Sequence, residues 1–226
     1  MNAAQISQIL EHRYLPELIP FSEEFIQPVM QEQRTSLILF TSNPNRDRIK
    51  PYFLEYEKAA HEMFSTTASK EDKLLFVVSG VSYGIQVRLA EVVGIREDEL
   101  PALFVIRTKK DAMTEKWRYT GNDVEELTVE KVRGFINDFR EGNVERVYKS
   151  ERVLDKEPGP REVRRIVGKT WDKTVNDPKK EVFVAIISEF CRACRDLEET
   201  WAELAESTPN DLLIATYNID QNEIPG

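Results

Sequence analysis

A pair of cysteines, Cys191 and Cys194, constrains this chain more than any other feature of its sequence. The apolar run at 182–187 precedes the pair and predicts a buried strand. After the pair, apolar residues recur at the spacing of a helix, at Leu197, Trp201, Leu204 and Ala205. A C-x-x-C motif between a strand and a helix indicates a dithiol that cycles between thiol and disulfide. The start of the helix favours a thiolate at Cys191, because the positive end of the helix dipole lies there.

The length and charge of the chain limit its class and its partners. With 226 residues, the chain is long enough for two domains of about 100 to 120 residues each. A formal net charge of −9 argues against nucleic acid and anionic membrane surfaces as partners, because phosphate groups would be repelled. No stretch approaches the roughly 18 consecutive apolar residues that membrane insertion needs. Met1 is not followed by a secretory signal, so we expect either a cytosolic protein or an internal piece of a longer precursor.

The small number of cysteines and histidines argues against a metal site. Two cysteines cannot form a disulfide framework, and a structural zinc site needs about four ligands. His12 and His61 are the only histidines, and both lie far from the cysteines in sequence. We therefore predict no metal and no cofactor.

The first part of the chain alternates between strands and helices. Residues 2–14 have a helical pattern that stops before Pro16. From residue 18 the predicted order is βαβαβαββα, which indicates an α/β fold with a mostly parallel sheet, helices on both faces and a final antiparallel hairpin. The predicted strands lie at 18–21, 36–40, 74–79, 100–106 and 115–119, and the longer helices at 52–64, 85–93 and 128–139. These are the elements of a thioredoxin fold, without a cysteine at its usual active-site loop.

A charged segment separates this first module from a second one. Residues 143–161 contain the break Pro158-Gly159-Pro160 and predict an exposed linker. The order βαβαβ then begins again, with strands at 163–167, 182–188 and 212–220, and it stops before Gly226. We therefore predict two thioredoxin-like modules, of which the second is incomplete and continues beyond the given sequence.

These features resemble the protein disulfide isomerase family. The resemblance implies a redox-inactive b′ domain at 1–142, a linker at 143–161 and a truncated catalytic a′ domain at 162–226, with 1–14 as the last helix of a preceding domain. In the first part, Leu100-Pro101-Ala102 lies where this fold has a structural cis-proline, and Gly94-Ile95 precedes it. The second part carries the resemblance in the run Val167-Gly168-Lys169-Thr170-Trp171, the strand at 181–184, the cysteine pair, Leu197, Trp201, Leu204 and the strand that ends in Asp220.

The resemblance also implies a function. Cys191 would attack a protein disulfide and Cys194 would be the buried resolving thiol, in thiol–disulfide exchange on folding client proteins in the endoplasmic reticulum lumen. The partners would be unfolded or disulfide-containing proteins. The b′ domain would bind unfolded polypeptide through an apolar groove, for which the candidates are Leu15, Leu18, Phe21 and Met30; ordinary core packing is the alternative for these four residues.

The cysteine motif departs from the family's usual W-C-G-H-C-K. Here Arg192 and Ala193 lie between the cysteines, and Ala185 occupies the position of the family's buried acid. Glu189 opposes ionisation of Cys191 by like charge, and Arg192 partly offsets it. We therefore expect a slower and less oxidising site. Two alternatives stay open, namely a redox-weak or inactive relative that binds polypeptide or acts as a structural subunit, and a cytosolic or organellar thioredoxin-like reductase.

Overall fold

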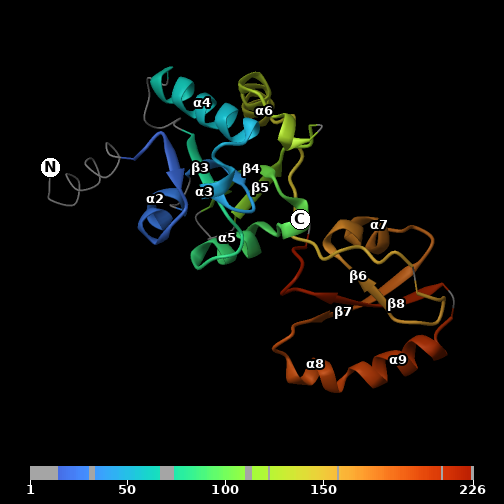
Figure 1. Ribbon diagram of the computed structural model, residues 1–226. Coiled ribbons are helices and arrows are strands. Elements are labelled where there is room, and N and C mark those ends of the chain that lie inside the picture. Colours follow the sequence, from blue (N-terminus) through green and yellow to red (C-terminus); the bar gives the residue numbers. More distant parts are fainter. Residues whose placement is uncertain are drawn as a thin grey trace, which may run out of the picture. The chain divides into compact units, whose positions relative to one another are not determined.

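The chain divides into two units, Met1–Val147 and Tyr148–Gly226. The computed structural model describes residues 15–30, 34–66, 74–109, 114–121, 123–156, 158–209 and 211–224 (Figure 1). The helix predicted at 2–14 lies outside these residues. Short 3₁₀ turns connect the larger elements: η1 (Glu23–Phe25), η2 (Glu97–Glu99), η3 (Val124–Glu126) and η4 (Gly168–Thr170).

A mixed five-stranded sheet forms the centre of the first unit. Its strands are ordered β1-β3-β2-β4-β5, where β1 and β2 run parallel to β3, β4 runs antiparallel to β2, and β5 antiparallel to β4. Every residue of β3 and nearly every residue of β2 is buried, as expected for strands that are covered on both faces. The predicted succession of strands and the final hairpin are confirmed, whereas the sheet is mixed and not mostly parallel, because β4 runs antiparallel to β2 as well as to β5. The strands are β1 (Leu18–Pro20), β2 (Thr35–Phe40), β3 (Leu75–Ser79), β4 (Ala102–Thr108) and β5 (Thr114–Arg118).

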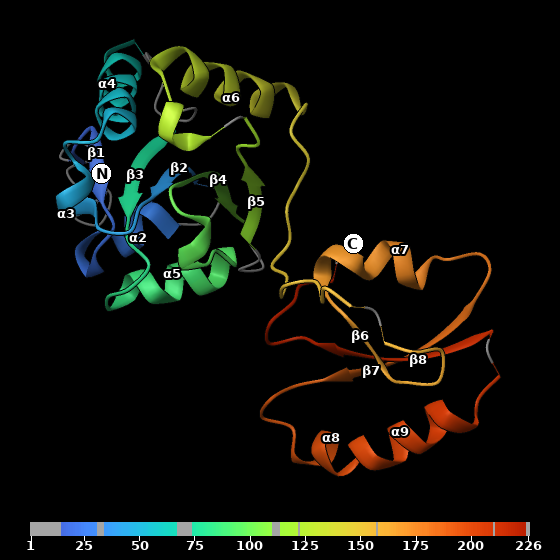
Figure 2. The same cartoon turned by 45° about the vertical axis from the view of Figure 1, so that its right-hand side comes forward.

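Helices cover both faces of this sheet (Figure 2). Helices α4 (Pro51–Thr66) and α6 (Val129–Glu141) pack on one face, and α2 (Ile26–Met30) and α5 (Ile85–Val93) on the other. The short helix α3 (Pro44–Asp47) precedes α4. None of the helices in the described part of the chain is long and apolar enough to cross a membrane.

The ends of these helices follow from local sequence. The Thr128 hydroxyl accepts a hydrogen bond from the Lys131 amide at 3.3 Å and so caps the start of α6. Gly94 and Gly142 end α5 and α6 in the left-handed conformation, with φ of 79° and 78°. The peptide bond before Pro101 is cis, which is the isomer that the resemblance implies.

The second unit is built on a parallel three-stranded sheet with the order β6-β8-β7. Its strands are β6 (Arg164–Ile166), β7 (Glu181–Ile187) and β8 (Leu212–Asn218). Helix α7 (Trp171–Val175) covers one face, and α8 (Arg192–Asp196) and α9 (Glu198–Ser207) lie along the other (Figures 1 and 2). The buried core is small: Ile166, Ala215 and Tyr217 on the α7 side, and Trp201, Ala205 and Ile214 on the α9 side.

The prediction that residues 182–187 form a buried strand is wrong in its burial. The strand forms, as β7, but none of its residues is buried, and Phe183 and Ile186 are 52% and 46% exposed. The reason is topological, because β7 lies at an edge of the three described strands and pairs there with β8 alone. An apolar run predicts a strand, while the number of neighbours that cover it is set by the sheet.

A short segment from the predicted linker packs onto the second unit. The Lys149 amide donates to the Glu223 carboxylate at 2.9 Å, and the Glu151 amide donates to the Asn222 side chain at 2.8 Å. Ser150, between them, is buried, and its hydroxyl accepts from the Lys169 amide at 3.0 Å. Residues 149–151 are therefore part of the second unit and differ from the exposed segment that composition alone predicts.

Gly168 lies directly beneath this segment, and replacing it with alanine should displace the segment. A Cβ at Gly168 would lie 2.6 Å from the Lys149 carbonyl oxygen and 3.1 Å from the Ser150 Cβ, so the backbone must move. We expect Gly168→Ala to lower the free energy of unfolding of the second unit by about 1–3 kcal/mol, measured by urea denaturation. Gly159→Ala is the control, because its Cβ would meet only the Glu162 side chain, at 3.4 Å. Equal stability of the two variants would contradict this packing.

Candidate functional site

The two cysteines form a disulfide at the start of α8. Their Cα atoms are 5.2 Å apart, and the Cys191 Sγ accepts a hydrogen bond from the Cys194 amide at 3.1 Å. Both cysteines are half-buried, and the intervening Arg192 and Ala193 are exposed. After reduction, the same amide is placed to stabilise a thiolate on Cys191.

Cys194 differs from the buried resolving thiol that the resemblance implies. It is half-buried because α8 contributes no buried residue to the core. The helix that was expected to continue from the cysteines to Ala205 is also interrupted at Leu197, between α8 and α9, although no proline stands there. The dithiol thus lies on a short, exposed helical turn.

Two further residues that the sequence predicts to modulate the pair are Glu189 and Ala185. Glu189 accepts side-chain hydrogen bonds from Gln221 at 2.8 Å and from Asn218 at 3.3 Å, so its carboxylate is held at the end of β8. Its like-charge effect on Cys191 stays a prediction. Ala185, at the position where the resemblance implies a buried acid, is half-buried and packs against the core on the α9 side.

An exposed aromatic ring lies immediately before the first cysteine. Phe190 is 88% exposed, and Ile219, after β8, is 47% exposed. Such exposure of a large apolar side chain removes it from the core and leaves it available to a partner.

Two residues that hold the loop before Cys191, Ser188 and Asp220, were not predicted as site residues from the sequence. Asp220 accepts hydrogen bonds from the Ser188 hydroxyl and the Glu189 amide, each at 2.7 Å. A signal for them exists in the sequence, because each follows one of two strands that prove to be parallel neighbours, β7 and β8. The carboxyl ends of such strands meet at one edge of a sheet.

The four residues predicted to bind peptide pack against two different cores of the first unit. Leu18 packs against the core beneath α4 and α6, whereas Leu15 and Met30 pack against the core on the α2 and α5 side. Phe21 belongs to this second core and is only 3% exposed. This arrangement is that of core packing for Phe21, and it leaves partial exposure at the other three.

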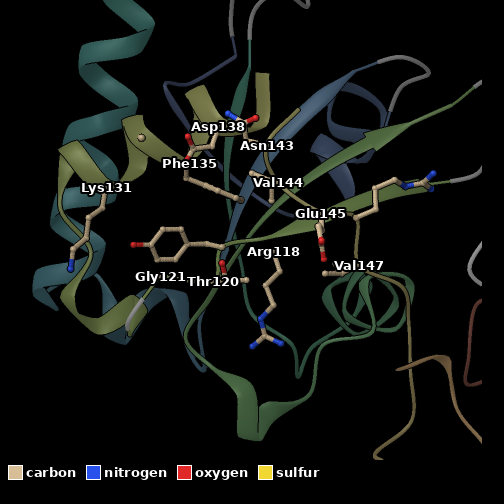
Figure 3. A pocket seen from close by; sticks show the side chains of 13 residues that line it. Arg118, Thr120, Gly121, Lys131, Phe135, Asp138, Asn143, Val144, Glu145 and Val147 are labelled. Atoms are coloured by element: carbon tan, nitrogen blue, oxygen red, sulfur yellow. The ribbon is translucent and has the colours of Figure 1, made fainter. Parts of the chain in front are cut away.

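The first unit has a pocket of about 800 Å³, shown in Figure 3. Its lining comes from the end of β5, from α6 and from residues 143–147, and includes none of the four predicted peptide-binding residues. Arg118, at its edge, donates to the Glu99 carboxylate at 2.8 Å. Burial alone would raise the pKa of Glu99, but hydrogen bonds from the Arg118 side chain and the Arg96 amide, with the charges of both arginines, outweigh it and lower the pKa.

In the described part of the chain, no group of three or more His, Cys, Asp or Glu side chains is placed to hold a metal ion.

The chain is similar to several known proteins. Residues 162–225 match the thioredoxin family. The protein disulfide-isomerase of Gallus gallus is 26% identical over 221 residues, which cover 95% of this chain and 40% of that protein. The corresponding protein of Oryctolagus cuniculus is 27% identical over 226 residues, 97% of this chain and 41% of that protein. Among solved structures, the zinc-bound form of human ERp44 is similar at a TM-score of 0.41 and 14% identity, over 92% of this chain and 52% of that chain.

The chain thus spans about 40% of the length of each of these two isomerases. The thioredoxin match includes both cysteines, and the similarity to the two isomerases extends over both units. The chain is thus similar to members of the protein disulfide isomerase family over nearly its whole length, and its second unit matches the thioredoxin family.

Proposed function

We propose that the chain carries out thiol–disulfide exchange on protein clients, with Cys191 as the nucleophile and Cys194 as the resolving thiol. The observation that carries the proposal is the disulfide between them, on an exposed helical turn where neither sulfur is enclosed by the core. A dithiol in this setting can react with a disulfide on another protein.

The exchange proceeds in two steps, attack on the client disulfide and resolution of the mixed disulfide. The Cys191 thiolate attacks one sulfur of a client disulfide, which forms a mixed disulfide and releases the other client sulfur as a thiolate. The Cys194 thiolate then attacks the Cys191 sulfur, which forms the Cys191–Cys194 disulfide and releases the second client thiolate. Two electrons pass from the dithiol to the client, and the reverse sequence oxidises a client dithiol.

The proposed division of labour follows the two units. Residues 1–142 act as a b′ domain that binds unfolded polypeptide, residues 143–161 connect, with 149–151 packed onto the second unit, and residues 162–226 carry the catalytic a′ function. The absence of cysteine from the first part of the sequence supports a non-redox role for it. Partial exposure of Leu15, Leu18 and Met30 supports their participation in polypeptide binding, and Phe21 would support them from the core. The endoplasmic reticulum lumen is the proposed compartment, because disulfide exchange on folding proteins belongs to oxidising environments.

A second candidate is a polypeptide-binding protein whose dithiol does not turn over. The observation that favours it is the loss of helper residues, since Ala185, Arg192 and Ala193 stand where the family has a buried acid, a glycine and a histidine. Loss of an acid–base group slows proton transfer by about 10²-fold or more. The two candidates differ in whether Cys191 attacks a client disulfide.

Trapping the mixed disulfide tests the proposal. Reduced Cys194→Ser protein, mixed with a peptide that contains one disulfide, should accumulate a covalent adduct on Cys191, because the resolving thiol is missing. Mass spectrometry would identify the adduct by the mass of the peptide and locate it. The matched variant Cys191→Ser, which keeps Cys194, should form the adduct at least about tenfold more slowly. Equal adduct formation by the two variants would contradict the assigned roles, and no adduct in either would favour the second candidate.

A further inference from the structure

The turn that follows β8 supports the loop that leads into the cysteines. A single oxygen of Asp220, Oδ2, accepts from the Ser188 hydroxyl and from the Glu189 amide, each at 2.7 Å. Hydrogen bonds to a carboxylate at this distance are short and stronger than those between neutral groups. Asp220 therefore fixes both a side chain and the backbone of the loop.

Hydrogen bonds continue from Ser188 to the reactive sulfur. The Ser188 hydroxyl accepts from the Phe190 amide at 3.3 Å, and the Ser188 carbonyl accepts from the Cys191 amide at 3.0 Å. The Cys191 Sγ in turn accepts from the Cys194 amide at 3.1 Å. A displacement of Ser188 would consequently move Cys191 relative to the amide that its sulfur faces.

The backbone of Asp220 is itself fixed by two further hydrogen bonds. Its amide donates to the Asn218 side chain at 2.9 Å, and its carbonyl accepts from the Lys149 ammonium at 2.7 Å. The preceding Ile219 amide donates to the Ile187 carbonyl at 3.0 Å, which ties the turn to the end of β7. A reactive group is positioned well when the residues behind it are themselves fixed.

We infer that Asp220, acting through Ser188, is a positioning residue that holds Cys191 in the geometry for attack. This inference rests on the proposed function of Cys191. Within the described part of the chain, the Asp220 carboxylate accepts hydrogen bonds from the loop and from neither cysteine, so it acts through the loop and not on the reacting atoms. The role assigned to it is geometric: it keeps the Cys191 sulfur in line with the Cys194 amide.

If Asp220 positions Cys191, its removal should disfavour the Cys191 thiolate. If Asp220 acts only by its negative charge, its removal should favour the thiolate. Removing a negative charge near a thiol favours the thiolate, whereas loosening the loop removes an amide hydrogen bond from the thiolate and disfavours it. Asp220→Asn keeps an oxygen acceptor in place and removes the charge. Asp220→Ala removes both the charge and the acceptor, so the difference between these variants isolates the geometric role.

The test measures alkylation of Cys191 by iodoacetamide against pH, in the full reduced chain with Cys194→Ser as background. We expect alkylation at pH 7 to be about three- to tenfold slower in Asp220→Ala than in Asp220→Asn, with its midpoint at higher pH. Ser188→Ala should also slow alkylation of Cys191, relative to the Cys194→Ser background. Asp211→Ala is the control, because Asp211 is an exposed acid at the other end of β8.

Two results would overturn the inference: equal rates for Asp220→Ala and Asp220→Asn, or Ser188→Ala indistinguishable from its background. Circular dichroism shows whether Asp220→Ala folds, and if it does not, Ser188→Ala decides alone. Alkylation reports the surroundings of Cys191 whether or not clients are turned over. A failure of the proposed function would instead appear in the trapping experiment, so the two outcomes can be told apart.

Discussion

Replacing Trp201 with alanine is expected to destabilise the second unit by about 3–5 kcal/mol. Trp201 is 9% exposed and is the largest buried side chain on the α9 side of the sheet. Its indole Nε1 donates to the Ala215 carbonyl at 3.0 Å, and its ring lies 4.9 Å from that of Phe183. Removing the indole leaves a cavity and removes this hydrogen bond in a unit that has few other buried apolar residues.

Hydrogen exchange in urea measures this loss where it occurs. Peptides from β7 and β8 report the second unit alone, so unfolding of the first unit does not enter the comparison. Trp201→Phe should lose about 1–2 kcal/mol, because it keeps a ring and removes the hydrogen bond. Glu203→Ala, on the exposed face of α9, is the control and should change little. A loss in Trp201→Ala no larger than that of the control would show that α9 does not hold this sheet.

The fold of the first unit could be predicted because its local signals agree with one another. Uninterrupted apolar runs at 37–40 and 74–78 predict strands that are covered on both faces, and β2 and β3 have that position. Glycines at 94 and 142 end the helices where the apolar periodicity stops. No information from distant parts of the chain is needed for either prediction.

Predictions that depended on distant neighbours were less successful. Residues 182–187 form the expected strand, but burial requires cover that an edge position does not provide. Residues 149–151 have the composition of a linker, yet the acceptors that hold them, Asn222 and Glu223, lie more than 70 positions later. Composition reports how a segment interacts with water and says nothing of a specific partner so far along the chain.

In the candidate site, too, the local feature could be predicted and the contact between distant residues could not. The cysteine pair is visible as a motif, because both residues lie within one turn of helix. Ser188 and Asp220 are 32 positions apart and meet because β7 and β8 are parallel neighbours. Their contact becomes predictable only when the sheet order is known, whereas the chemistry of the cysteines can be predicted without it.

Reduction of insulin by dithiothreitol, compared between the wild-type chain and Cys191→Ser, tests the central claim most directly. Serine keeps the size of the side chain and removes the nucleophilic sulfur, so the covalent route through Cys191 is lost while the fold is retained. We expect the wild-type chain to accelerate the reaction and Cys191→Ser to return it to the rate without protein. Hydrogen exchange in β8 serves as the check that the variant is folded. Equal rates for the wild-type chain and Cys191→Ser would contradict the claim that this dithiol turns over.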